Sequence, residues 1–203
     1  MSAEPAAGAA RLERLARGLR GGGARDERCE LCIAPLDGSH RHVVDVPART
    51  LLCVCRPCAV LFARAANETE RFRAVPERRE RLASFVLEDE SWRALGVPVG
   101  LAFFVRSTPD ARVRALYPGA LGVTEAEPEA GAWESLVLAN PVLAELEPDV
   151  EALLVCRAGG AREHWRVGVD VCYALAGVVR RHWRGFTGGD EAWTAIRAFF
   201  AEL

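Results

Sequence analysis

Five of the seven cysteines lie within one stretch of the chain, residues 29–58. Two pairs, Cys29 with Cys32 and Cys55 with Cys58, are separated by two residues, a spacing that lets one turn of the chain direct two thiolates at one metal ion. A tetrahedral ion needs four donors that converge on a point, and two such turns supply them. The sequence therefore predicts a metal site with these four cysteines as ligands.

Cys53 is the alternative ligand. It precedes Cys55 by two residues, so on a regular strand both side chains would point to the same side. His40 and His42 alternate in the same way and share one face of a predicted strand. Because four thiolates already complete a tetrahedral shell, we interpret these histidines as surface residues or as residues that support a ligand from outside the shell.

Zinc and iron both accept four thiolates in a tetrahedral arrangement. The paired cysteines resemble those of zinc ribbons and also those of rubredoxins, whose iron site usually has glycine after the second thiolate of each pair. Here Ile33 and Ala59 occupy those positions, and neither has the conformational freedom of glycine. We therefore expect Zn²⁺ as the cofactor, with iron as the alternative.

The residues around the cysteines predict a small metal-binding module at 26–75. A turn at 35–38 separates the first pair from a strand at 40–46, and a second strand at 50–54 delivers the second pair. A short helix follows at 59–64. A module of about 50 residues can bury little apolar surface, so metal binding should contribute to its folding free energy.

The rest of the chain predicts an α+β interaction domain at 76–203. The fold class we expect is a small zinc-ribbon-like N-terminal module followed by an antiparallel sheet with helices packed on one face. Residues 1–25, rich in Ala, Arg and Gly, are predicted to form a flexible arm. The domain's strands are expected at 101–105, 113–117, 150–156 and 164–169, and its main helices at 88–95, 132–138, 171–183 and from 190 onward.

Composition excludes several classes of protein. The chain has 203 residues with 26 basic and 28 acidic side chains, a balance that argues against nucleic-acid binding. No stretch approaches the roughly 20 apolar residues of a membrane span, and no targeting segment is visible. We expect a cytoplasmic protein, and in a reducing compartment clustered cysteines favour metal binding over disulfides. No convincing catalytic constellation occurs, so an enzyme is not predicted.

Several segments together resemble a bacterial protein family of unknown function whose genes often lie beside those of nickel-iron hydrogenases. The resemblance covers about residues 26–203 and implies an accessory part in hydrogenase assembly or electron supply. Hydrogenase subunits or maturation factors would then be the protein partners, and the family has no assigned catalytic residues. The segments are 29–32, 51–58, 101–104, 140–143, 147–154, 162–165 and 182–185.

These observations predict a metal-binding accessory protein with a structural zinc. A rubredoxin-like iron electron carrier that serves a hydrogenase is the first alternative. An HNH-like nuclease is the second, because residues 28–32, 40–42, 51–53 and 56–58 resemble that scaffold. The nuclease pattern fails further along, since only Asn67 follows the second cysteine pair as a possible catalytic His or Asn within the module.

Overall fold

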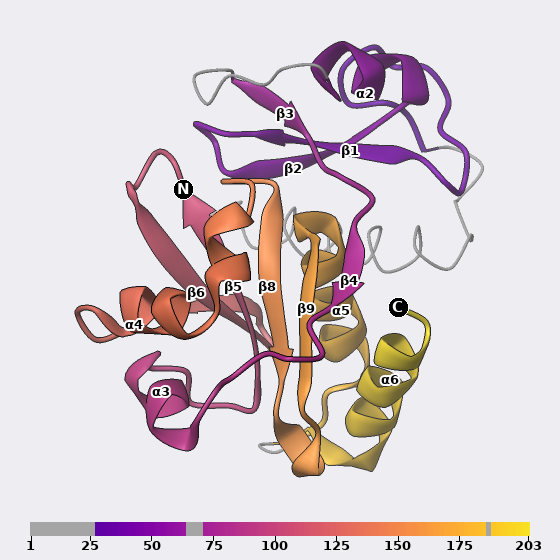
Figure 1. The fold of residues 1–203 in the computed structure, drawn as a ribbon. Helices are drawn as coiled ribbons and strands as arrows, with labels where there is room; N and C mark the ends of the chain where they lie inside the picture. The colour runs from indigo at the N-terminus through magenta and orange to yellow at the C-terminus, as the bar shows by residue number, and fades with distance from the viewer. Residues whose placement is uncertain (1–26, 64–70, 186–187) are drawn as a thin grey trace, which may run out of the picture.

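The computed structural model describes residues 27–63, 71–185 and 188–203, so the predicted arm at 1–25 lies outside the described residues. Two antiparallel sheets form the fold, one of three strands and one of six. Figure 1 shows the small sheet at one end of the large one. The α+β class predicted from the sequence is confirmed.

The small sheet has the order β2-β1-β3, with β1 at Arg41–Asp45, β2 at Thr50–Val54 and β3 at Phe72–Ala74. Helix α2, Arg56–Ala63, follows β2 directly. In the β1–β2 hairpin His42 lies opposite Cys53. Because successive side chains on a strand point to opposite faces, this pair shares one face of the hairpin.

The large sheet has the order β4-β9-β8-β5-β6-β7, with every pair of neighbours antiparallel. Its central strands are apolar over nearly their whole length because both faces of the sheet are covered. The strands are β4 at Arg79–Arg81, β5 at Leu101–Ser107, β6 at Arg112–Gly119, β7 at Gly122–Ala126, β8 at Glu151–Cys156 and β9 at Glu163–Gly168.

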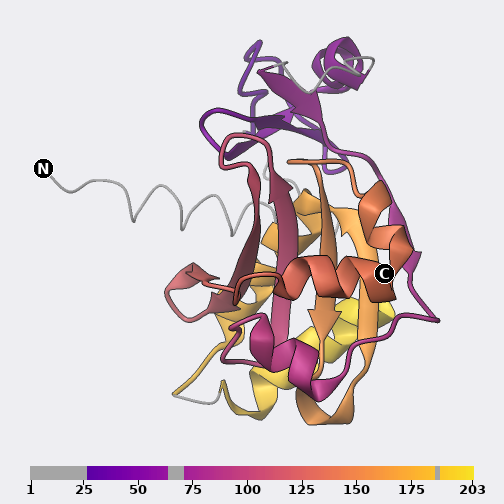
Figure 2. The same ribbon diagram turned by 60° about the vertical axis from the view of Figure 1, so that its left-hand side comes forward.

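Helices cover both faces of this sheet. The sequence predicted helices on one face only, and the long helices α5, Val169–His182, and α6, Gly189–Ala201, do pack together on one face. The other face carries α3, Asp89–Ala94, and α4, Ala132–Ala139, on the opposite side in Figure 2. This second layer exists because β5 directs a large apolar side chain to each face, Phe103 toward α5 and Phe104 toward α4. Short 3-10 turns lie at Pro141–Glu145 and Ala158–Gly160.

The small sheet packs against the large one through one face of its hairpin. Val44, Val46 and Leu51 belong to the same hydrophobic cluster as α5, α6 and the large sheet. Val43 and Val54, which point the other way, belong to a separate small cluster with α2. The hairpin therefore has an inner face toward the large sheet and an outer face toward α2, and the domain boundary near residue 75 stays a prediction. No helix in the described ranges is both long and apolar enough to cross a membrane.

Candidate metal centre

The first cysteine pair lies on a tight turn. The backbone N–H of Cys29 donates to the carbonyl of Ala34 at 2.8 Å, and the N–H of Ile33 donates to the carbonyl of Cys29 at 2.9 Å. Ile33 has a φ of 65°, the left-handed conformation that favours glycine. The turn thus has the shape in which glycine is usual, but an isoleucine adopts it at a cost of about 1–2 kcal/mol.

The second pair lies at the start of a helix. Cys55 immediately precedes α2 and Cys58 is in its first turn, where the N–H of Ala59 donates to the carbonyl of Cys55 at 3.0 Å. The N-terminus of a helix carries a partial positive charge that stabilises thiolates. A helix start in place of a second free turn means that the resemblance to a zinc ribbon is not confirmed.

The sulfur atoms of Cys29, Cys32, Cys55 and Cys58 all lie within 4.8 Å of one another. The sulfurs of Cys32 and Cys55 are 3.6 Å apart, far longer than a disulfide bond of about 2.05 Å. Four thiolates about 2.3 Å from a tetrahedral Zn²⁺ would be separated by about 3.8 Å. The four predicted ligands can therefore hold one ion, with Cys29 and Cys58 buried and Cys32 exposed.

The four thiols do not ionise independently. Burial alone would raise the pKa of Cys29, but backbone hydrogen bonds from Cys55, Cys32 and Leu31 lower it to about 6. Burial and the three neighbouring sulfurs raise the pKa of Cys58 well above its ordinary value. Like charges this close cannot all ionise without compensation, which a bound cation provides.

Cys53 lies outside this group, on the inner face of the hairpin with His40 and His42. The chain turns into α2 after Val54, so the strand alternation that would align Cys53 with Cys55 ends between them. Ring nitrogens of both histidines and the sulfur of Cys53 lie within 4.8 Å of one another, and all three residues are buried. Burial excludes the surface position considered for the histidines from sequence.

Both histidines are oriented by hydrogen bonds. Nδ1 of His42 is 2.9 Å from Oδ2 of Asp170, and Nδ1 of His40 is 3.1 Å from the carbonyl oxygen of Asp37. Burial alone would lower the pKa of His42, but Asp170 and the Cys53 thiol raise it to about 9. Burial would raise the pKa of Cys53, and the two histidines lower it to about 7.

Asp170 is a residue of this region that the sequence analysis did not single out. The helix expected at 171–183 begins two residues earlier, at Val169 with Gly168 as its N-cap, so Asp170 lies in the first turn of α5. The carboxylate of Asp170 contacts His42, which lies 128 residues earlier in the chain. Only the packing of the hairpin on α5 brings the two together, so no local sequence signal could have identified the contact.

The model of one protein family, described as a family of unknown function (DUF5947), matches residues 28–203. The chain belongs to this family. The matched range includes the four-cysteine group, the His40, His42 and Cys53 group, and both sheets. No curated protein and no solved structure matches the chain.

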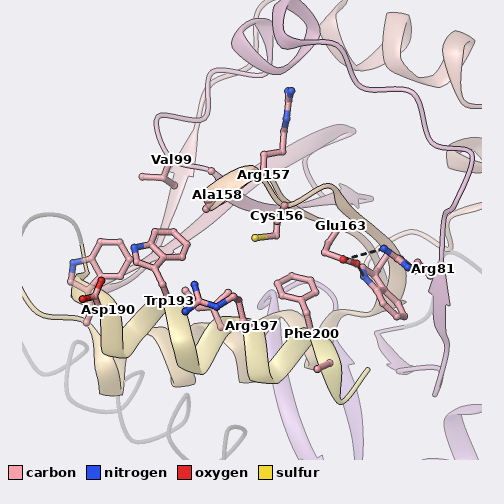
Figure 3. A pocket seen from close by; sticks show the side chains of 18 residues that line it. Arg81, Val99, Cys156, Arg157, Ala158, Glu163, Asp190, Trp193, Arg197 and Phe200 are labelled. Carbon is pink, nitrogen blue, oxygen red and sulfur yellow. Dashed lines mark hydrogen bonds and ion pairs between the residues drawn. The ribbon is translucent and has the colours of Figure 1, made fainter.

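A cavity of about 1300 Å³ lies away from both groups, between α6 and the turn joining β8 to β9. Figure 3 shows Trp193, Arg197 and Phe200 of α6 directed toward Cys156 across it. Burial raises the pKa of the Cys156 thiol, and no histidine is among the residues that line the cavity. The cavity is therefore lined in part by aromatic side chains and lacks a histidine that would activate this thiol.

Proposed function

We propose that this protein is an accessory protein that binds a structural Zn²⁺ through Cys29, Cys32, Cys55 and Cys58. We further propose that its metal-bound module contacts a subunit or a maturation factor of a nickel-iron hydrogenase in the cytoplasm. The observation that carries the metal-binding role is the convergence of four sulfurs within 4.8 Å. The hydrogenase assignment is supported by the resemblance of residues 26–203 to proteins encoded beside hydrogenases.

A structural role for the ion follows from the small size of the hydrophobic cluster on the outer face of the hairpin, whose buried residues are Cys29, Val43, Val54, Cys58 and Ala59. Only five residues of that cluster are buried, and two of them, Cys29 and Cys58, are proposed ligands. The ion would replace the apolar core that the outer face lacks, because its binding free energy becomes folding free energy. It would also offset the left-handed backbone of Ile33. Zinc suits this role since it has no redox chemistry.

Exposed apolar side chains beside both cysteine pairs support an interaction role. Ile33 follows the first pair and is 61% exposed, while Val60 and Leu61 follow the second pair and are 62% and 73% exposed. Exposed apolar surface of this kind marks contacts with other proteins. The expected partner surface is apolar, and the metal would fix the backbone that presents these three side chains.

The metal assignment is tested on the purified full chain, by comparing metal content with that of Cys32→Ser. Because Cys32 is exposed, serine removes a ligand without creating a buried defect. We expect the variant to lose one colourless zinc ion. A red protein that loses iron on the same substitution would overturn the zinc assignment and support the iron electron carrier.

The partner assignment is tested by direct binding of the purified chain to purified hydrogenase subunits and maturation factors. Leu61→Asp should weaken binding about tenfold or more, since an exposed apolar anchor contributes more than about 1 kcal/mol. Leu121→Asp is the matched control, because Leu121 is fully exposed in the turn between β6 and β7, remote from the cysteines. Equal binding by the two variants, or no binding by the parent chain, would contradict the proposal.

A further inference from the structure

Three metal-binding side chains meet on the inner face of the hairpin, separate from the four cysteines. His42 on β1 lies directly opposite Cys53 on β2, and His40 lies two residues before His42 on the same face. The exposed fractions of His40, His42 and Cys53 are 9%, 8% and 5%. The two imidazole rings have centroids 5.0 Å apart and an interplanar angle of 67°, so their edges can be directed at a shared point.

The hydrogen bonds fix which nitrogen of each ring is available. A carbonyl oxygen can only accept, so Nδ1 of His40 carries the proton that it donates to Asp37. Nδ1 of His42 donates in the same way to the carboxylate of Asp170. In the neutral rings each Nε2 then has a free lone pair. Neither Nε2 has a hydrogen-bond partner in the described part of the chain, and both are buried.

A buried nitrogen without a partner loses the free energy of its contact with water, so it requires an explanation. The arrangement matches that of metal-binding histidines, whose second ring nitrogen is bonded to a carboxylate or a backbone carbonyl. Here one histidine has each kind of partner. A cation between the two Nε2 atoms and the sulfur of Cys53 would satisfy all three donors.

Asp170 is held in place by the close packing of α5 on the hairpin. Its Oδ1 accepts a hydrogen bond from the N–H of Val171 at 2.9 Å. A side chain at Gly168 would come within 2.5 Å of the carbonyl oxygen of Pro76 and 2.7 Å of Asp170 Oδ1. The glycine therefore allows the strand-to-helix junction to approach the segment that leaves β3, and it leaves the carboxylate free to orient His42.

We propose that His40 Nε2, His42 Nε2 and Cys53 Sγ form a second metal site, which binds Zn²⁺ with a fourth position open to water or a small ligand. Three protein ligands with one open position are typical of zinc sites that do chemistry, whereas structural sites have four. Both histidines and Asp170 line a cavity of about 560 Å³, which Arg41, Glu77 and Arg78 also line. A ligand would reach the open position through this cavity.

Copper also binds two histidines and one cysteine, usually with a distant methionine as a weak fourth ligand. The only methionine in the chain is Met1, so zinc is the better match. The alternative to a metal site is a nucleophilic Cys53 activated by His42 and Asp170. Such a site needs only one histidine, so it would leave His40 without a role. A nucleophile would also have to line the cavity, and Cys53 does not.

Zinc content of the full chain tests this site independently of the partner. We expect two zinc ions per chain in the parent protein and one in each of Cys53→Ser, His40→Gln and His42→Gln. The single variant Cys32→Ser should also retain one, and Cys32→Ser combined with His42→Gln none. Cys156→Ser is the control for removal of a buried thiol and should retain two.

Co²⁺ substitution adds a readout that does not depend on stability. In Cys32→Ser, the Co²⁺ ion that remains should show a thiolate-to-metal charge-transfer band. Addition of Cys53→Ser to the same chain should remove this band. Asp170→Asn should weaken metal binding at this site 10- to 100-fold, the usual effect of losing the group that orients a ligand histidine. One zinc ion in the parent chain, or two in all three site variants, would overturn the proposal. Rapid alkylation of Cys53 in the zinc-loaded chain would favour the nucleophile instead.

Discussion

The two groups of metal-binding side chains lie on opposite faces of the same β1–β2 hairpin, and their surroundings differ. On the outer face, the four cysteines make up part of a cluster with few other buried residues. On the inner face, Cys53 belongs to the cluster that spans α5, α6 and the large sheet. An ion on the outer face would therefore stand in for a missing core. An ion on the inner face would lie beside a core that is already complete.

This difference separates structural from chemical use of a metal. The outer group offers four donors and closes the coordination shell, which leaves no position for a ligand. The inner group offers three donors, holds both imidazoles by hydrogen bonds, and lies beside a cavity. We expect removal of the outer ion to affect folding strongly, and removal of the inner ion to affect it little.

The largest effect is expected from Cys32→Ser. A structural zinc contributes about 10 kcal/mol or more of apparent binding free energy, so its loss should unfold the turn that carries Cys29 and Cys32 together with α2. Hydrogen exchange should become fast in α2 but stay slow in β1 and β2, whose inner face packs in the large cluster, and in β5 and β8. His42→Gln should leave exchange in α2 unchanged. Slow exchange in α2 of Cys32→Ser would show that the outer ion is not structural.

A smaller effect, confined to the large sheet, is expected from Glu151→Gln. Glu151 is fully buried, with ion pairs of 2.7 Å to both Arg166 and Arg78. Breaking a buried pair leaves an uncompensated charge, so urea unfolding at saturating zinc should show a loss of about 3–5 kcal/mol. Zinc content should not change.

Glu145→Gln is the matched control for this variant. Glu145 also pairs with Arg166, at 3.2 Å, but its side chain is 71% exposed. Exposed pairs contribute at most about 1 kcal/mol. Equal losses of stability in the two variants would show that burial of the Glu151 ion pair contributes nothing extra. Loss of zinc from Glu151→Gln would show that the large sheet is coupled to the metal sites.

Local patterns in the sequence predicted most elements of the fold. Continuous apolar residues located β5 and β8, and the helix expected at 88–95 is α3. The first strand of the domain was expected at 101–105, but residues 79–81 already form β4 at the edge of the large sheet. Exposed edge strands carry charged side chains, so composition alone could not distinguish β4 from a linker.

The candidate sites show the same limit. The spacing of Cys29 with Cys32 and of Cys55 with Cys58 predicted a group that the fold brings together, because each pair is local. The inner group depends on the register that places His42 opposite Cys53, and its support by Asp170 depends on tertiary packing. Neither the register nor the packing is encoded in a short motif.

The smallest effect, and the most direct comparison of the two faces, is expected from Val43→Ala and Val44→Ala. These neighbours are both buried, but Val43 packs with Cys29 and Cys58 whereas Val44 packs with Cys53 and the large cluster. Each truncation should lower the free energy of unfolding by about 2 kcal/mol. Only Val43→Ala should also speed the loss of the outer zinc ion to a chelator, because only Val43 contacts the cluster that holds its ligands. Equal zinc release from both variants would mean that the hairpin transmits strain between its faces, and that the two sites are coupled.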